Sequence, residues 1–144
     1  MPSPIRDHLR HAIPSWVDEK DKWFVTICCQ PRAVNQLASP VAAAVYRSAL
    51  AFYESKGLIK PVLSVLMPDH LHIVAQFDHR KGMPRAVAGL KQHLARHAGV
   101  SWQKGFFDHR LRGEREVAEK CRYVRNNPVR AGLCDAPADW PFTY

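Results

Sequence analysis

Two apolar segments separated by only two residues constrain the fold of this chain more than any other feature. The segments are 58–67 (LIKPVLSVLM) and 70–77 (HLHIVAQF), and Pro68 and Asp69 lie between them. Parallel strands need a crossover connection of about a dozen residues or more, which two residues cannot provide. The segments are therefore predicted to form an antiparallel hairpin.

The second strand of this hairpin carries two histidines, one residue apart. Side chains alternate between the faces of a strand, so His70 and His72 share one face, with Cβ atoms roughly 6–7 Å apart. Leu71 and Ile73 point the other way, toward the expected helices. Two imidazoles at this spacing can bind one divalent metal ion. They can equally be two polar residues on a partly solvated face, and so short a motif leaves both readings open.

The other elements alternate between strand and helix. Aromatic and β-branched residues predict a strand over 22–30, whereas 101–111 is either a short strand or an aromatic loop. Helices are predicted over 40–56, 83–99 and 113–127. The resulting order, β-α-β-β-α-β-α, is the split β-α-β pattern. It predicts an α+β fold: a ferredoxin-like antiparallel sheet with helices packed on one face.

The length of 144 residues suits one compact domain. We expect a basic N-terminal arm over 1–21, the domain over 22–134, and a tail over 135–144 that runs as turns on the surface. The four cysteines contain no C-x-x-C pair, which favours free thiols over a structural zinc site.

Charge indicates the kind of partner. The net charge is +8, which favours a polyanion, and nucleic acid before a membrane surface. No apolar run approaches the ~18–20 residues that span a bilayer, so we expect a cytoplasmic protein with no membrane partner.

A second pair of candidate residues lies in the last predicted helix. Tyr123 and Asn127 are four residues apart and therefore share a helix face. A phenolic oxygen can act as a nucleophile, and an amide oxygen suits a hard cation. A tyrosine packing its ring at a helix end and an asparagine ending a helix before Pro128 would account for the same residues.

Taken together, the two motifs resemble a known family. MPDHLHIV, followed about fifty residues later by RYVRNNPVRAGL, resembles the single-tyrosine transposases of the HUH superfamily, and within them the REP-associated tyrosine transposases. WFVTI is similar to their first strand, and WQKGFFDHRLR is similar to the segment between their motifs. The likeness extends from about residue 22 to 134.

The resemblance implies a role for each motif residue. His70 and His72 would be the metal-binding HUH pair, Tyr123 the nucleophile, and Asn127 the third ligand, which is glutamine in many relatives. It implies Mg²⁺ or Mn²⁺ as cofactor and cleavage of single-stranded or hairpin DNA through a 5′-phosphotyrosine intermediate. The working form would be a monomer or a homodimer, associated with the nucleoid.

Basic and aromatic residues would hold the DNA. The candidates for phosphate binding are Lys91, Arg96, Arg110 and Arg112. Trp102, Phe106 and Phe107 either stack on bases or pack in the core.

Two other functions remain open. A non-catalytic regulator that holds hairpin DNA or RNA would keep the same fold. A metal-dependent hydrolase of small molecules would use His70 and His72, although the charge of +8 suits an extended polyanion better.

Overall fold

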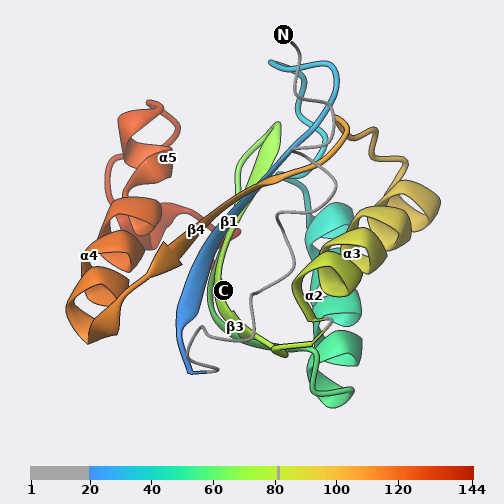
Figure 1. The fold of residues 1–144 in the computed structure, drawn as a ribbon. Helices are drawn as coiled ribbons and strands as arrows, with labels where there is room; N and C mark the ends of the chain where they lie inside the picture. Colours follow the sequence, from blue (N-terminus) through green and yellow to red (C-terminus); the bar gives the residue numbers. More distant parts are fainter. Residues whose placement is uncertain (1–19, 81) are drawn as a thin grey trace, which may run out of the picture.

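The computed structural model describes residues 20–80 and 82–144, so most of the predicted N-terminal arm lies outside the described residues. One four-stranded antiparallel sheet has the order β2-β3-β1-β4. The elements are β1 (Lys22–Cys28), α2 (Pro40–Ser55), β2 (Ile59–Leu66), β3 (His70–Phe77), α3 (Gly82–Ala98), β4 (Phe107–Leu111), α4 (Gly113–Arg125), α5 (Asn127–Arg130) and a 3₁₀ turn (Pro137–Asp139) (Figure 1). The predicted α+β fold and its element order are confirmed.

The predicted hairpin is present as β2 and β3. Leu66 pairs with Leu71, and the Met67 N–H donates to the His70 carbonyl at 2.9 Å, which closes the turn around Pro68 and Asp69. β3 lies between β2 and β1, so the histidine-bearing strand is an inner strand with neighbours on both sides.

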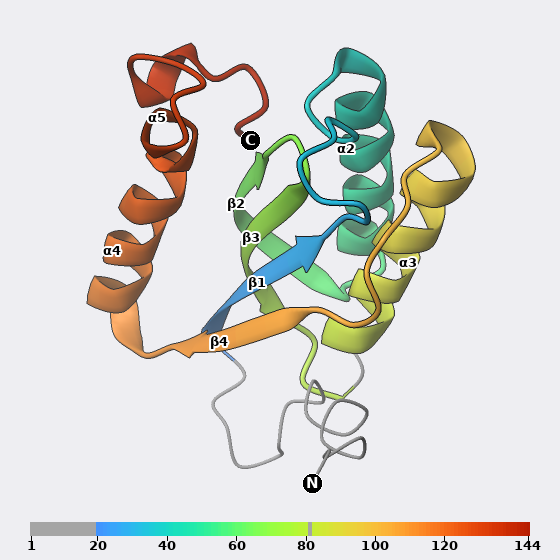
Figure 2. The same cartoon turned by 90° about the horizontal axis from the view of Figure 1, so that it is seen from above.

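Each face of the sheet is covered by different helices (Figure 2). Leu71 and Ile73 are fully buried in the larger core, which α2 and α3 close, as predicted. α4 lies on the opposite face, where Val124 packs with Val65 and Val74 in a second apolar cluster. The expectation that helices cover one face therefore holds for α2 and α3 but not for α4. The physical reason is that Leu63, Val65 and Val74 form an apolar patch on the second face of β2 and β3, and this patch also needs a cover.

The last helix is interrupted where it was expected to be continuous. The prediction was one helix over 113–127, but α4 ends at Arg125 and α5 begins at Asn127. Pro128 has no N–H to donate to the preceding turn, which accounts for the break. The ambiguous segment 101–111 forms β4 in its second half, while Trp102 makes an isolated bridge with Cys29.

The C-terminal residues run as turns that are not buried, and the last of them also pair with β2. The Ser64 N–H donates to the Tyr144 carbonyl at 2.7 Å, and the Tyr144 N–H donates to the Ser64 carbonyl at 2.8 Å. The Trp140 Nε1–H donates to the Leu66 carbonyl at 3.0 Å. Because β2 is an edge strand with unpaired backbone groups, the end of the chain satisfies part of that edge.

The four cysteines are free thiols, as expected. None of the helices in the described ranges has the length and apolar character needed to cross a membrane.

Candidate active site

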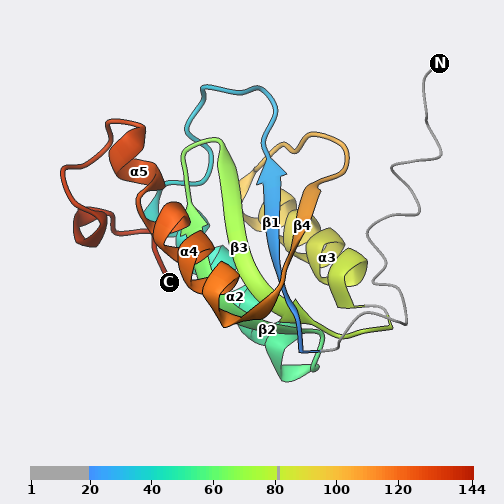
Figure 3. The same cartoon turned by 60° about the vertical axis from the view of Figure 1, so that its left-hand side comes forward.

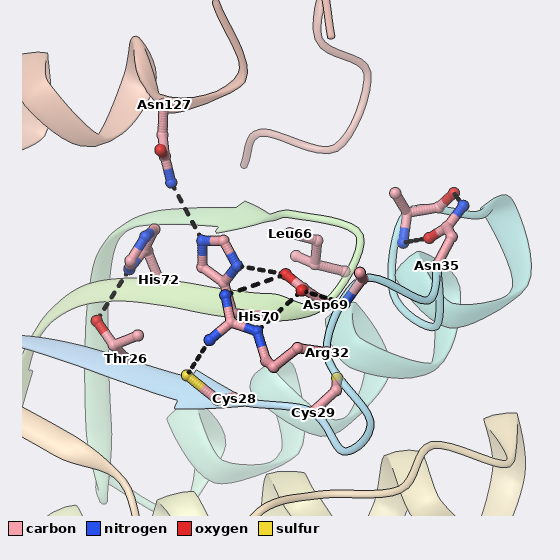
Figure 4. A network of polar contacts seen from close by, with 12 residues as sticks. Thr26, Cys28, Cys29, Arg32, Asn35, Leu66, Asp69, His70, His72 and Asn127 are labelled. Atoms are coloured by element: carbon pink, nitrogen blue, oxygen red, sulfur yellow. Dashed lines mark hydrogen bonds and ion pairs between the residues drawn. The ribbon is translucent and has the colours of Figure 1, made fainter. Parts of the chain in front are cut away.

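The two histidines lie side by side at the start of β3, on the face that α4 covers (Figure 4). Their ring centroids are 4.7 Å apart and the rings are nearly perpendicular, at 76°. His70 and His72 pair across the sheet with Cys28 and Thr26 of β1, so all four side chains share this face. The alternation predicted from the sequence is confirmed.

An aspartate holds the first histidine. His70 Nδ1 lies 2.8 Å from Asp69 Oδ1. Asp69 Oδ2 accepts from Arg32 Nε and from the Ala33 N–H, each at 2.8 Å. Burial acts to raise the pKa of the Asp69 carboxyl, but the hydrogen bonds from Arg32, Ala33 and His70 outweigh it and hold that pKa well below its usual range. The ionised carboxylate therefore accepts the Nδ1 proton of His70, and in the neutral ring Nε2 is then the nitrogen with the lone pair.

The second histidine is held by a hydroxyl. His72 Nδ1 lies 3.0 Å from Thr26 Oγ1, and its ring packs against Phe24 with centroids 5.1 Å apart. Burial, followed by the charges of His70, Arg130 and other nearby cations, lowers the pKa of His72 to about 3. His72 is therefore a neutral imidazole near pH 7, the form that binds metals.

Asn127 brings the end of the helical segment to the histidines. Its Nδ2 lies 3.3 Å from His70 Nε2, across 57 residues of sequence (Figure 4). Amide nitrogen and oxygen positions are assigned from the hydrogen-bond network, and the reversed amide presents Oδ1 to the same point. The structure thus joins the two halves of the candidate site.

Tyr123 lies near the end of α4, four residues before Asn127 at the start of α5, and α4 covers the histidine face of the sheet. Arg130 Cζ lies 3.7 Å from the centroid of its ring, and Lys120 Nζ lies 5.3 Å from it. Lys120 Nζ is also 4.8 Å from the Phe24 ring, which in turn contacts His72. The Tyr123 side chain is 56% exposed, so a macromolecular substrate can reach it. Within the described part of the chain, no hydrogen bond joins it to the histidines or to Asn127.

The chemistry of the donor set fits a divalent metal. Protein partners engage the Nδ1 atoms of both histidines, so each Nε2 is the nitrogen suited to a ligand bond. A carboxylate that accepts from the far nitrogen of a ligating histidine is the usual support of such a site, and Asp69 occupies that position for His70. Residues 20–80 and 82–144 contain no group of three or more histidine, cysteine or acidic side chains able to hold a metal. The third ligand that the resemblance implies is the Asn127 amide, which lies 3.3 Å from His70 Nε2.

The predicted phosphate-binding residues do not gather at the histidines. Lys91 Nζ donates to the carbonyls of Gln103 and Gly105 at 2.9 and 3.0 Å, which fastens α3 to the following loop. Arg96 is exposed on the same helix, which covers the opposite face of the sheet. Arg110 Nε donates to Asp21 at 2.6 Å, and the exposed Arg112 directly precedes α4. Their role in DNA binding remains a prediction.

Other residues at the site were not predicted from the sequence. Asp69 and Thr26 hold the histidines, and Arg32, Lys120 and Arg130 surround them with positive charge. Asp69 had a local signal, because it immediately precedes the first histidine. Arg32 had none, since the β1–α2 connection reaches Asp69 only in the folded chain.

The fold and the site agree with the resemblance. A four-stranded antiparallel sheet with a histidine pair on one face, met by an amide from the last helical segment, is the arrangement that the resemblance to the HUH transposases predicted. No family model matches the chain.

Individual relatives are more specific. The chain is 24% identical over 139 residues to a candidate REP-associated tyrosine transposase of Haemophilus influenzae, covering 84% of this chain and 77% of that protein. It is 24% identical over 82 residues to the REP-associated tyrosine transposase of Escherichia coli K12, covering 55% and 50%. The resemblance to REP-associated tyrosine transposases is confirmed.

Solved structures agree on the fold. A REP-associated tyrosine transposase bound to a REP hairpin superposes with a TM-score of 0.78 at 20% identity, covering 90% of this chain and 79% of that one. A candidate transposase from Deinococcus radiodurans gives a TM-score of 0.51 at 17% identity, covering 78% and 94%.

Proposed function

We propose that this protein is a metal-dependent single-stranded DNA endonuclease and strand transferase that acts on DNA flanking a hairpin or repeated palindrome. The transposase relatives support the general class. The observation that carries the proposal is the contact between Asn127 and His70, because it unites on one sheet face the two motifs that resemble this family.

Tyr123 is the nucleophile. Its Oη attacks the scissile phosphorus and forms a phosphotyrosine bond to the 5′-phosphate end of the cleaved strand. The bond from phosphorus to the 3′ oxygen breaks, the phenol loses its proton, and the departing strand ends in a 3′-OH. Attack by another 3′-OH reverses the step and joins strands without a nucleotide cofactor, because the phosphotyrosine bond conserves the phosphodiester energy.

His70, His72 and Asn127 would hold Mg²⁺ or Mn²⁺. When bound, the ion polarises the scissile phosphate as a Lewis acid. Imidazole ligands suit Mn²⁺ better than Mg²⁺, which prefers oxygen. Arg130 and Lys120 lie beside the tyrosine ring and supply positive charge for the phosphate backbone.

The experiment that tests the nucleophile compares two tyrosine variants. With Mn²⁺ and a hairpin oligonucleotide carrying single-stranded flanks, the unmodified protein is expected to form a covalent adduct that survives denaturing electrophoresis. Tyr123→Phe is expected to abolish the adduct while leaving hairpin affinity within about twofold. Tyr144→Phe is the matched control, because Arg47 stacks on that ring as Arg130 does on Tyr123.

Persistence of the adduct in Tyr123→Phe would contradict the assignment of the nucleophile. If the unmodified protein with bound metal holds hairpins tightly but cleaves none of a library of flanking sequences, the alternative of a non-catalytic hairpin-binding regulator is correct instead.

Metal removal tests the second part of the site. EDTA is expected to abolish the adduct and added Mn²⁺ to restore it, whereas His72→Ala is expected to lose Mn²⁺ binding in calorimetry. Adduct formation unaffected by EDTA would contradict the metal-dependent mechanism.

A further inference from the structure

A phenylalanine on β4 is left open to solvent beside the candidate active site. Phe107 is 67% exposed, whereas its neighbour Phe106 packs against the core under α2 and α3. Successive side chains of a strand face opposite sides, so Phe107 points to the face that carries the histidines.

The sheet register gives the position of Phe107 relative to the site. Phe107 pairs with Thr26 of β1, and Thr26 pairs with His72 of β3. The three residues form one cross-strand row on one face. At about 4.8 Å per strand, the Cα atoms of Phe107 and His72 are about 10 Å apart.

No helix of the described residues covers this part of the face. α4 packs its buried Val124 against Leu63, Val65 and Val74 of β2 and β3. In Figure 3, α4 lies over the β2–β3 side of the sheet, whereas most of β1 and β4 is not overlain by a helix on this side. The next residue of β4 on this face, His109, is also exposed. Phe107 therefore presents an aromatic surface that the described chain leaves uncovered.

Charge identifies the occupant. Lys120 lies over the ring of Phe24, which packs against His72, and Arg130 lies over Tyr123, so the end of the row near the active site is cationic. Single-strand binding sites combine cations that follow the phosphates with aromatic rings on which bases stack. Stacked nucleotides are spaced by about 3.4 Å along a strand. The separation of about 10 Å between Phe107 and His72 therefore corresponds to about three nucleotides from a phosphate at the histidines.

We propose that Phe107 is a stacking platform for one base of single-stranded DNA, within about three nucleotides of the scissile phosphate. The proposal rests on the proposed function, because it takes the histidines as the position of that phosphate. It adds a base-binding subsite to a site that otherwise contacts backbone.

The test uses abasic nucleotides and the non-cleaving Tyr123→Phe chain. Hairpin oligonucleotides with varied flanks are first ranked by affinity, and an abasic residue is then moved along the flank of the best one. In the protein that retains Phe107, the abasic residue at one position of the flank is expected to weaken binding by about 5- to 150-fold, the range of base–aromatic stacking. In Phe107→Ala the same abasic substitution is expected to change the affinity less than twofold.

Two further variants keep the test independent of folding. Phe52→Ala removes a ring of similar exposure, 53%, on α2 behind the sheet and is expected to leave all affinities unchanged. Phe107→Trp is expected to retain binding and to show quenched tryptophan emission with intact DNA but not with the abasic strand at the sensitive position.

Equal abasic penalties in the Phe107 and Phe107→Ala proteins at every position would overturn the proposal. The proposal would also be overturned if the tryptophan emission of Phe107→Trp changed with protein concentration in the absence of DNA. A second copy of the chain would then cover the ring. Binding is measured without cleavage, so failure here is distinguishable from a missing tyrosine adduct, which would count against the proposed function.

Discussion

At the scale of single residues, the two histidines of the candidate site are oriented by hydrogen bonds to neighbouring side chains. Asp69 fixes the His70 ring by one oxygen and is itself fixed by Arg32 and a backbone N–H at the other. Thr26 does the same for His72 with a hydroxyl. The orientation of both imidazoles is thus set before any ligand arrives, which lowers the entropy lost when a ligand binds.

Replacing the Asp69 carboxylate tests this support. Asp69→Asn keeps the shape but removes the charge that accepts the His70 Nδ1 proton. We expect Mn²⁺ affinity to fall about 10- to 100-fold, the usual effect of removing such a partner. Calorimetry measures the affinity, and ¹⁵N NMR of the metal-free protein is expected to show loss of the single His70 tautomer.

Asp139→Asn is the matched control, because it removes the charge of an exposed carboxylate in the 3₁₀ turn. Unchanged affinity together with an unchanged tautomer in Asp69→Asn would show that Asp69 does not position His70.

At the scale of elements, local patterns predicted more than long-range ones. The short connection at Pro68 and Asp69 was sufficient for the hairpin, and the prolines and glycines located α2 and α3 closely. The break between α4 and α5 was missed, as was the pairing of Tyr144 with Ser64. The pairing of Tyr144 with Ser64 depends on which strand lies at the edge of the sheet. The strand order is a property of the assembled sheet, and no local sequence pattern predicts it.

The contact between α2 and α3 depends on a single glycine. A Cβ at Gly89 would overlap the ring and hydroxyl of Tyr53 on α2. Gly89→Ala is expected to lower the free energy of unfolding by about 1–3 kcal/mol, because overpacking outweighs the gain in helix propensity of up to about 1 kcal/mol. Urea denaturation measures the change.

The double-mutant cycle with Tyr53→Ala supplies the control. In that background Gly89→Ala is expected to be neutral or stabilising, because the overlapping ring is gone. Equal destabilisation in both backgrounds would mean that the glycine is needed for another reason.

At the scale of the whole molecule, the sheet separates a structural face from a candidate DNA-binding face. α2 and α3 close the main core on one side, whereas α4 lies on the other (Figure 2). The sheet register puts the histidines and Phe107 on that second side, and Tyr123 belongs to α4. The net charge of +8 predicts binding that weakens with salt, but the cations that matter are those on the second face.

Two lysines that contact aromatic rings test that separation. Lys120 lies over Phe24 and Tyr123 on the candidate DNA-binding face, whereas Lys56 lies over Phe52 behind the sheet. Lys120→Gln is expected to reduce the slope of log affinity against log salt by about 0.7, the value for one phosphate contact on a single strand. Lys56→Gln is expected to leave the slope unchanged. Filter binding to single-stranded DNA over a salt series measures both, and equal slopes in the two variants would place the phosphates elsewhere.

The sequence by itself determined the hairpin and the common face of His70 and His72, because strand alternation acts over a few residues. Only the tertiary structure decided that α4 packs on the histidine face, that Asn127 meets His70, and that Arg32 reaches Asp69. The last two contacts join residues 57 and 37 positions apart. They depend on which apolar surfaces pack together, and local periodicity does not specify that choice.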